Sequence, residues 1–238
     1  MFKSSWAANI DVSEGNENFT YQDKYLLGKS QEKDDDDDNE FNVLYYCKFD
    51  IKNAKIPSQV KIIKKNSFQS CSKLKSIIFP ENSKLKKIES FAFSCTPIKK
   101  LILPSTVEEI DSSCFYNVCK LNYIEILSNN PFFSVLKKQI LLKNEHLKDG
   151  KVNKVLVFAI RKIENVKIPS DVDYIDEYAF NNCKNLKSIS FEKNSSVKFI
   201  KNDAFSFIWG PRIFVVPPSV VEVCSNAFSH MKNVETIT

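Results

Sequence analysis

The stretch IPSDVDYIDEYAFNNCKNLKSISF (residues 168–191) decides the fold of this chain of 238 residues. Within it, Val172 and Ile175 stand eight and five positions before Phe180, and the small residue Ala179 directly precedes the ring. The same frame recurs around six phenylalanines, which are Phe68, Phe93, Phe115, Phe180, Phe205 and Phe228. Self-similarity at a period of roughly 20 to 50 residues is typical of a solenoid, in which each unit buries its apolar face only against its neighbours.

The second half of each unit predicts a strand. Ile189 and Phe191 alternate with Ser188 and Ser190, which is the period-two pattern of a strand with one buried face. Stacked units place these strands side by side in a parallel sheet, with neighbours about 4.8 Å apart. On the other side of each coil, the apolar pair and the Ala-Phe step predict a short strand or a single helical turn. The predicted fold class is therefore α/β and strand-dominated.

The consensus of these units, IPSxVxxIxxxAFxxCxxLxxIxF, resembles the BspA-like leucine-rich repeat of surface antigens. The resemblance covers about residues 54–127 and 167–238. The units at 80–103 and 192–216 depart from it, since Asn-Ser replaces Pro-Ser in both and Pro211 occupies the Leu position of the second. The resemblance implies a leucine-rich-repeat solenoid of about six to seven coils with a parallel concave sheet. It also implies adhesion or protein binding instead of catalysis, although a fold alone does not determine function.

A second, longer similarity divides the chain. Residues 43–46 and 53–58 match 155–158 and 165–170 at a constant offset, and residues 19–27 parallel 133–142. We interpret both upstream segments as β-hairpins that lead into repeat blocks. The predicted organisation is one continuous solenoid domain: an N-terminal hairpin and partial repeat (1–53, with an acidic loop at 32–40), a first repeat block (54–127), a β-hairpin insertion (128–166) and a second repeat block (167–238).

The pleat of the predicted concave strands sends every second side chain outward, where a ligand would bind. The candidate ligand-binding residues are Ser76, Ile78, Lys100, Ile102, Tyr123, Glu125, Ser188, Ser190, Ile213 and Val215. Several are aliphatic, and contiguous exposed apolar area often marks a contact site; β-branched residues are equally favoured in strands for their own sake. Trp209, in an anomalous corner at 207–211, either caps a distorted coil or is a second anchor, because Trp is enriched at interface hot spots.

The charge is unevenly distributed. The net charge is +5, but residues 32–40 hold seven acids and one lysine, a balance of −6, which leaves +11 on the remainder. A basic surface suits nucleic acid, an anionic membrane or an acidic glycan, so a polyanion or nucleic-acid binder is one alternative function. No nucleic-acid-binding motif supports that alternative. The aspartate run at 34–38 lacks the spacing of an EF-hand loop, so we interpret it as a solvated loop tip.

Nothing in the sequence predicts an enzyme. The chain has two histidines and seven cysteines, without a C-x-x-C pair, a P-loop, a G-x-G-x-x-G or a G-x-S-x-G motif. We therefore expect no catalytic residue, metal site, cofactor or small-molecule substrate. The positions of Cys47, Cys71, Cys114 and Cys183 match small or apolar positions of other repeats, which predicts buried thiols. Cys224 occupies a slot that is charged in other repeats, so it is the best candidate for an exposed thiol.

The signals for the partner and for the cellular compartment disagree. The resemblance implies a secreted or cell-surface protein with a protein or extracellular-matrix ligand. The first residues lack the apolar core of a signal peptide, which favours the cytoplasm and an intracellular interaction scaffold. No run approaches the roughly eighteen apolar residues of a transmembrane helix. The missing signal peptide has two other interpretations, which are another route of export and a fragment of a longer repeat protein, and the stop inside an expected strand at 235–238 is in line with a fragment. The sequons at 18–20 and 194–196 matter only after secretion.

Overall fold

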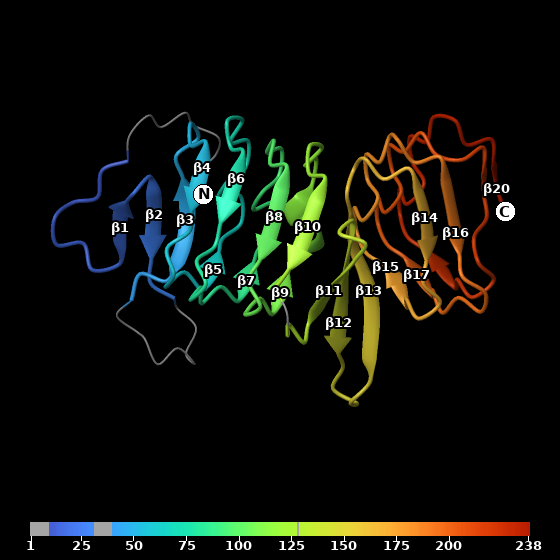
Figure 1. Ribbon diagram of the computed structural model, residues 1–238, viewed down its shortest axis with the longest axis horizontal. Helices are drawn as coiled ribbons and strands as arrows, with labels where there is room; N and C mark the ends of the chain where they lie inside the picture. Colours follow the sequence, from blue (N-terminus) through green and yellow to red (C-terminus); the bar gives the residue numbers. More distant parts are fainter. Residues whose placement is uncertain (1–9, 31–39, 128) are drawn as a thin grey trace.

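The computed structural model describes residues 10–30, 40–127 and 129–238, and within them the chain winds as a strand-dominated solenoid (Figure 1). Each turn contributes one strand to each of two rows that follow the long axis. Helix is almost absent from these ranges: one 3-10 turn, η1 (Ser112–Phe115), takes the position of the Ala-Phe step in the third repeat. No helix in the described residues is long and apolar enough to cross a membrane. The predicted leucine-rich-repeat solenoid is confirmed.

The first row holds the strand that comes earlier in each turn. Its members are β3 (Val43–Cys47), β5 (Ile62–Ile63), β7 (Lys87–Ile88), β9 (Glu109–Ile110), β13 (Val152–Ala159), β15 (Tyr174–Ile175), β17 (Phe199–Ile200) and β19 (Glu222–Val223). The second row holds the strands predicted to form the concave sheet. Its members are β4 (Asn53–Lys55), β6 (Ser76–Ile78), β8 (Lys100–Leu103), β10 (Tyr123–Ile126), β14 (Asn165–Ile168), β16 (Ser188–Phe191), β18 (Ile213–Phe214) and β20 (Thr236–Ile237). The described chain thus makes about eight turns instead of the predicted six to seven, because β3–β4 and β13–β14 add turns to the six phenylalanine repeats.

Two antiparallel hairpins extend the first row. β1 (Phe19–Gln22) and β2 (Tyr25–Gly28) precede β3, and β11 (Phe133–Leu136) and β12 (Ile140–His146) precede β13. Each arrangement has a register irregularity, between Leu26 and Leu27 in one and between Leu141 and Leu142 in the other. The tip of the β12–β13 hairpin projects beyond the solenoid body in Figure 1. The acidic segment at 32–40 lies outside the described residues except for Glu40.

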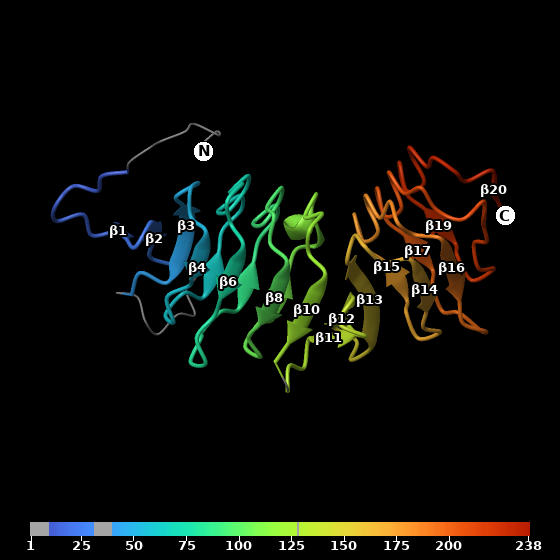
Figure 2. The ribbon, with the colours of Figure 1, turned by 45° about the horizontal axis from the view of Figure 1, so that its top comes forward.

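A column of phenylalanine rings runs through the interior. Ring centroids lie 5.6 Å apart for Phe68 and Phe93, 6.2 Å for Phe93 and Phe115, and 5.0 Å for Phe180 and Phe205. All five side chains are fully buried. Burying one such side chain contributes about 1.5–3 kcal/mol before the conformational entropy is counted. Within each block, the turns that Figure 2 shows stacked side by side are therefore joined by contacts between aromatic rings.

Phe158 and Arg161 join the inserted hairpin to this core. Phe158, on β13, is buried against Phe115 with ring centroids 4.7 Å apart. The buried Arg161 guanidinium lies 4.5 Å from the Phe158 ring centroid and donates to the carbonyl oxygens of Ala179 at 2.8 Å and Tyr178 at 3.1 Å. No carboxylate in the described ranges pairs with Arg161, so these carbonyl dipoles and the ring face offset part of its desolvation, while its buried Nε makes no hydrogen bond.

Left-handed backbone flanks the core phenylalanines at two fixed positions. Positive φ occurs two residues before the ring at Asn66, Phe91, Tyr178, Asp203 and Asn226, and two residues after it at Ser70, Cys95, Asn117, Asn182, Phe207 and His230. None of these is glycine, although this conformation costs an L-residue about 1–2 kcal/mol. Contacts between turns offset part of the cost: Asn182 donates to Asn117 Oδ1 at 3.1 Å, and the rings of Phe207 and His230 stack with centroids 4.5 Å apart.

The second row is divided into three sheets. The inserted hairpin was predicted to interrupt the solenoid at the first break, whereas the second break was not predicted. Pairing is parallel throughout, in the groups β4-β6-β8-β10, β14-β16 and β18-β20. At the first break the inserted hairpin intervenes, and Ile124 donates its N–H to the carbonyl oxygen of Lys138. At the second break no backbone hydrogen bond joins residues 186–192 to residues 209–216. Pro211 has no N–H to donate and Gly210 adopts a φ of +43°, so the chain enters β18 on a different path.

Candidate binding surface

The candidate residues of the first repeat block lie in register on three neighbouring strands. Ser76 on β6 pairs with Lys100 on β8, and Lys100 pairs with Tyr123 on β10. Ile102 and Glu125 pair two positions further along the same strands. The residues between them are buried, so the pleat sends the candidate side chains outward in this part of the row.

An apolar hollow of about 370 Å³ lies among these outward side chains. It is lined by Ser76, Ile77, Ile78, Phe79, Lys100, Ile102, Pro104 and Leu127. Ile78 is 47% exposed and Leu127 is 45% exposed, whereas Ile102 is half-buried at the centre. Apolar surface left in water costs about 25 cal/mol per Å², a free energy that a partner covering the hollow would recover. Leu127 was not predicted, because it follows the strand instead of lying within it.

A polar cluster borders the hollow on the β10 side. The Tyr123 hydroxyl donates to Glu125, and Glu125 forms an ion pair with Lys138 from the β11–β12 turn. The Lys100 ammonium lies 4.8 Å from the centroid of the Tyr123 ring. The hydrogen bond from Lys138 lowers the pKa of the Glu125 carboxyl, and the bond to Glu125 raises the pKa of the Tyr123 hydroxyl. The inserted hairpin thus supplies one member of a charged rim.

The remaining candidate residues lie on the other two sheets. Ser188 and Ser190 are exposed on β16, and Ile213 and Val215, in and after β18, are 59% and 58% exposed. Because the second row is broken on both sides of β14–β16, the predicted residues form three groups. The hollow belongs to the first group alone.

The sequence analysis missed the first strand of the first two groups. Asn53 on β4 and Asn165 on β14 are exposed, in register with Ser76 and Ser188. The Ser76 hydroxyl donates to Asn53 Oδ1 at 2.8 Å, and the Ser188 hydroxyl donates to Asn165 Oδ1 at 2.7 Å. The match of residues 53–58 to 165–170 could have identified both strands, because it marks each segment as the start of a repeat block.

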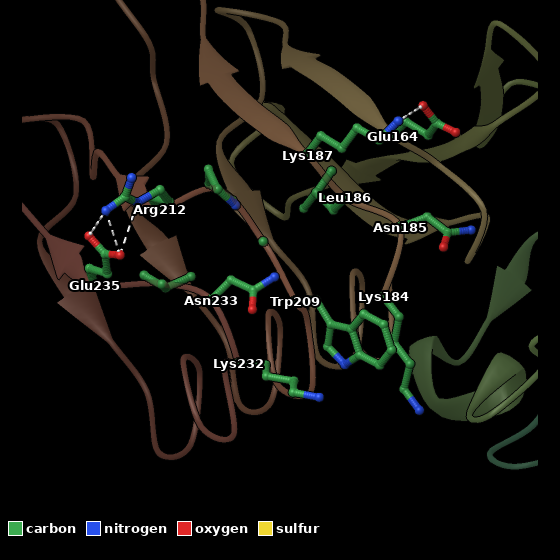
Figure 3. Close-up of a pocket in the computed structure, with 13 residues that line it drawn as sticks. Glu164, Lys184, Asn185, Leu186, Lys187, Trp209, Arg212, Lys232, Asn233 and Glu235 are labelled. Atoms are coloured by element: carbon green, nitrogen blue, oxygen red, sulfur yellow. Dashed lines mark hydrogen bonds and ion pairs between the residues drawn. The ribbon is translucent and has the colours of Figure 1, made fainter.

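Trp209 stands in a second, larger hollow of about 930 Å³ (Figure 3). Its side chain is 42% exposed, as a binding anchor requires. The ammonium groups of Lys184 and Lys232 lie 5.9 Å and 4.9 Å from its ring centroid. Trp209, Lys184 and Lys232 come from three successive turns, so the exposed indole lies between two positively charged side chains.

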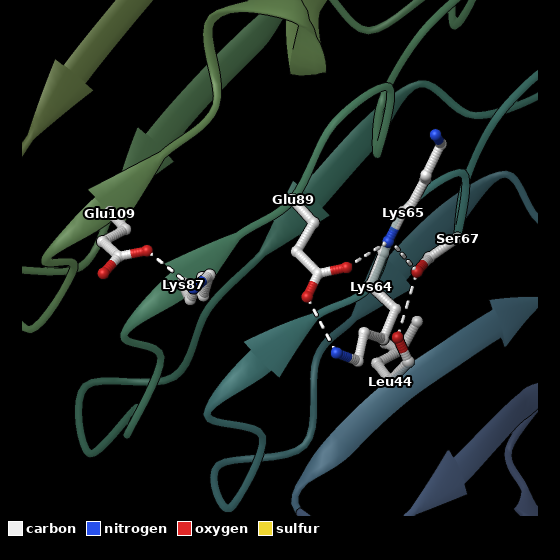
Figure 4. Close-up of polar contacts among 7 residues, drawn as sticks. All are labelled: Leu44, Lys64, Lys65, Ser67, Lys87, Glu89 and Glu109. Carbon is white, nitrogen blue, oxygen red and sulfur yellow. Dashed lines mark hydrogen bonds and ion pairs between the residues drawn. The ribbon is translucent and has the colours of Figure 1, made fainter. Parts of the chain in front are cut away.

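Charges on the first row pair between successive turns (Figure 4). Lys64 pairs with Glu89 at 2.8 Å, and Lys87 pairs with Glu109 at 2.8 Å. Glu89 also accepts the backbone N–H of Lys65 at 3.0 Å. Ion pairs at a surface contribute about 0–1 kcal/mol each. Their main consequence here is that these lysines present little uncompensated charge to a ligand.

The cysteines follow the prediction in the core and depart from it at the surface. Cys47, Cys71, Cys114 and Cys183 are buried, and burial raises the pKa of the Cys114 thiol. The prediction for Cys224 was wrong: Cys224 is half-buried, whereas Cys95 and Cys119 are exposed. Four of the five charged residues in the slot of Cys224 are half-buried as well, namely Lys64, Glu89, Asp176 and Lys201. Within the described ranges, no three His, Cys, Asp or Glu side chains are grouped so that they could hold a metal ion.

The sequence profile of the family described as "BspA type Leucine rich repeat region" matches residues 40–154 and 154–238, in six copies. A search among curated proteins found no match. The resemblance inferred from the Ala-Phe frame is thereby confirmed over most of the chain.

Solved structures show the same fold. The pneumococcal vaccine antigen PcpA gives a TM-score of 0.61 at 18% identity, covering 79% of this chain and 50% of that chain. A leucine rich cell surface protein from Faecalibacterium prausnitzii A2-165 gives 0.55 at 20% identity, covering 79% and 59%. A leucine-rich repeat protein from Eubacterium ventriosum ATCC 27560 gives 0.57 at 17% identity, covering 91% and 70%. The chain spans about half of PcpA and about three fifths of the cell surface protein, and at these identities the likeness concerns the fold alone.

Proposed function

Because the chain belongs to the BspA-type leucine-rich repeat family, we propose that it is a non-catalytic protein-binding module whose contact surface is the outward face of β4, β6, β8 and β10. The ligand we propose is a protein of a cell surface or of the extracellular matrix, which makes the module adhesive. Two similar structures are described as a vaccine antigen and a cell surface protein, and this supports an extracellular setting. The observation that carries the proposal is the apolar hollow at Ile78, Ile102 and Leu127.

The form of this surface suits protein recognition. An aliphatic centre at Ile78 and Ile102 is bordered by polar groups at Ser76, Lys100 and Tyr123. Binding energy in protein interfaces concentrates in such a central pocket, and the surrounding polar contacts exclude water from it. A hollow of about 370 Å³ has room for a large apolar side chain of the partner.

A second candidate function, polyanion binding, is favoured by one observation. Lys52, Lys75 and Lys99 directly precede β4, β6 and β8, and the N–H of Lys75 donates to the carbonyl oxygen of Lys52 at 2.7 Å. All three are exposed, and no carboxylate in the described ranges pairs with them. Like charges on adjacent strands repel one another, so an anionic ligand would stabilise this arrangement.

The same position carries compensated charges in the second block. There Lys187 pairs with Glu164 at 2.8 Å, and Arg212 pairs with Glu235 at 2.8 Å. An anionic polymer would therefore bind the first block in preference to the second.

Binding measurements separate the two functions. The purified chain is tested by biolayer interferometry against immobilised collagen, laminin, fibronectin and heparin, at about 0.05 M and 0.2 M salt, the interval over which phosphate-driven binding falls by orders of magnitude. The proposed function predicts binding to a matrix protein with an affinity that changes by less than tenfold between the two salts. If the chain binds heparin but none of the matrix proteins, and this binding is lost at the higher salt, the polyanion function is assigned instead. Labelling of intact cells with an antibody to the chain distinguishes the adhesive role from an intracellular scaffold.

A further inference from the structure

At the break between β16 and β18, the edges of the two strands that face each other form no backbone hydrogen bonds with one another. β16 bonds only to β14, and β18 bonds only to β20. Ile189, an inward residue of β16, is half-buried, whereas the equivalent Ile77 and Ile124 are buried. A strand edge with free N–H and C=O groups is a template for pairing with another chain.

The hollow that contains Trp209 (Figure 3) lies at the amino-terminal ends of β16, β18 and β20, because its lining runs through residues 184–187, 209–212 and 232–235, directly before these strands. Its lining includes the apolar side chains of Leu186 and Val234 and the backbone of Gly210. A Cβ at Gly210 would lie 3.0 Å from Val234 Cγ2 and 3.0 Å from Ile208 Cδ1. The missing side chain therefore lets the backbone at Gly210 pack closely against Ile208 and Val234 at one wall of the hollow.

The charge inside the hollow is positive. Figure 3 shows Lys184 and Lys232 near Trp209, at the opposite end from the pair Arg212–Glu235. Lys187 is likewise neutralised by Glu164. No carboxylate in the described part of the chain pairs with Lys184 or Lys232. Two uncompensated ammonium groups thus flank an exposed indole.

We propose that this hollow binds an extended acidic peptide segment of a partner protein. The peptide main chain pairs with the free edge at the break, which is the β-augmentation mode of peptide recognition. Carboxylates of the peptide lie on Lys184 and Lys232, forming charge-assisted hydrogen bonds. An apolar side chain of the peptide contacts Trp209 and the half-buried Val234. This site is separate from the hollow at Ile78 and does not depend on it.

The observations favour a peptide over an acidic saccharide. A saccharide lacks the regular series of N–H and C=O groups that a strand edge pairs with. The combination of a free strand edge and two uncompensated cations is complementary to an acidic strand.

Fluorescence anisotropy with a labelled peptide tests the charge requirement. The probe is fluorescein-EVDVEV-amide, titrated with the full chain. Lys184→Glu combined with Lys232→Glu should raise the Kd at least tenfold. The matched control is Lys73→Glu combined with Lys120→Glu, which places the same charges on exposed corners of the first block and should change the Kd less than twofold. Circular dichroism confirms that each variant is folded.

A second arm tests the strand pairing and the class of ligand. The same peptide with alternate backbone amides methylated keeps its charges but loses N–H donors, and its Kd should rise at least tenfold. Equal affinity of the methylated peptide would overturn the proposal. So would a heparin hexasaccharide that binds more tightly than the peptide and depends on the same two lysines, because the site would then belong to glycans.

Discussion

Phe158 lies against Phe115 with ring centroids 4.7 Å apart, although an entire antiparallel hairpin separates the two residues in the sequence. Phe158 does not stand in the repeated Ala-Phe frame, yet its ring occupies a place in the aromatic column. The column therefore passes from the first block into the inserted segment without a gap. The hairpin is part of the hydrophobic core in addition to being an insertion between repeats.

This contact predicts that Phe158→Ala destabilises the chain as strongly as a substitution in the repeat frame. Both Phe158→Ala and Phe180→Ala should lower the free energy of unfolding by about 3–5 kcal/mol, the usual loss for a buried phenylalanine. Phe207→Ala is the control, because this ring is 43% exposed and stacks only on His230. Its cost should stay below about 1 kcal/mol. Urea unfolding measures all three, and a Phe158 variant that resembles the Phe207 variant would place the hairpin outside the core.

The left-handed corners predict a stabilising glycine. Ser70 has a φ of 59° and an exposed side chain, so Ser70→Gly removes the steric cost of this conformation and loses little packing. Glycine also gains freedom in the unfolded chain, which offsets part of the benefit. We expect a net gain of about 0.5 kcal/mol and a higher Tm. Ser72→Gly, at an exposed position without positive φ, should lower the Tm slightly; the opposite order would mean that the corner is not strained.

The half-buried carboxyl of Asp176 predicts a pH dependence. Burial raises its pKa, so the folded chain holds this proton more tightly than the unfolded chain does. The resulting contribution to stability is present at low pH and is lost as the pH rises from the unfolded value near 3.9 through the higher folded value. Asp176→Asn keeps the Oδ1 acceptor for the N–H of Glu177, 2.9 Å away, without the charge. The variant should be more stable than the wild type at pH 7, and the difference should shrink toward pH 4. Urea unfolding across this range checks it, and a difference that is constant with pH would rule out the carboxyl as its cause.

Much of the fold follows from the sequence because each repeat contains, within its own residues, the signals for its buried face and for its strand. The spacing of Val172, Ile175 and Phe180 defines the buried face of a turn, and the alternation of Ser188 and Ile189 defines the strand. Stacking then follows, because no single turn can bury its apolar face alone. The outward direction of Ile78, Ile213 and Val215 came from the same alternation and agrees with their exposure.

The features that the sequence did not predict depend on the chain path between repeats. The break before β18 arises where Gly210 and Pro211 redirect the backbone. The spacing of apolar residues in the repeats does not indicate the direction that the backbone takes there. Phe158 supplies a ring to the aromatic column from β13, and the residues around it do not follow the spacing of the Ala-Phe frame. The left-handed corners escaped notice because residues such as Phe91 and Tyr178 occupy positions where glycine is the usual signal.

The central proposal is that the outward face of β6 and β8 binds a protein ligand. Ile78→Asp combined with Ile102→Asp places two charges in the hollow, where a partner would have to desolvate them. Val221→Asp is the matched control, because Val221 is a 70% exposed aliphatic residue that directly precedes β19 of the first row. Both variants should retain the far-UV circular dichroism of the wild type, since neither substitution affects a fully buried side chain.

The most direct measurement is the Kd of these variants for the matrix protein that binds the wild type in the interferometry panel. We expect the Ile78 and Ile102 double variant to raise the Kd at least tenfold, equivalent to a loss of about 1.4 kcal/mol, while Val221→Asp changes it less than twofold. A folded double variant that binds as tightly as the wild type would mean that this face is not the contact surface.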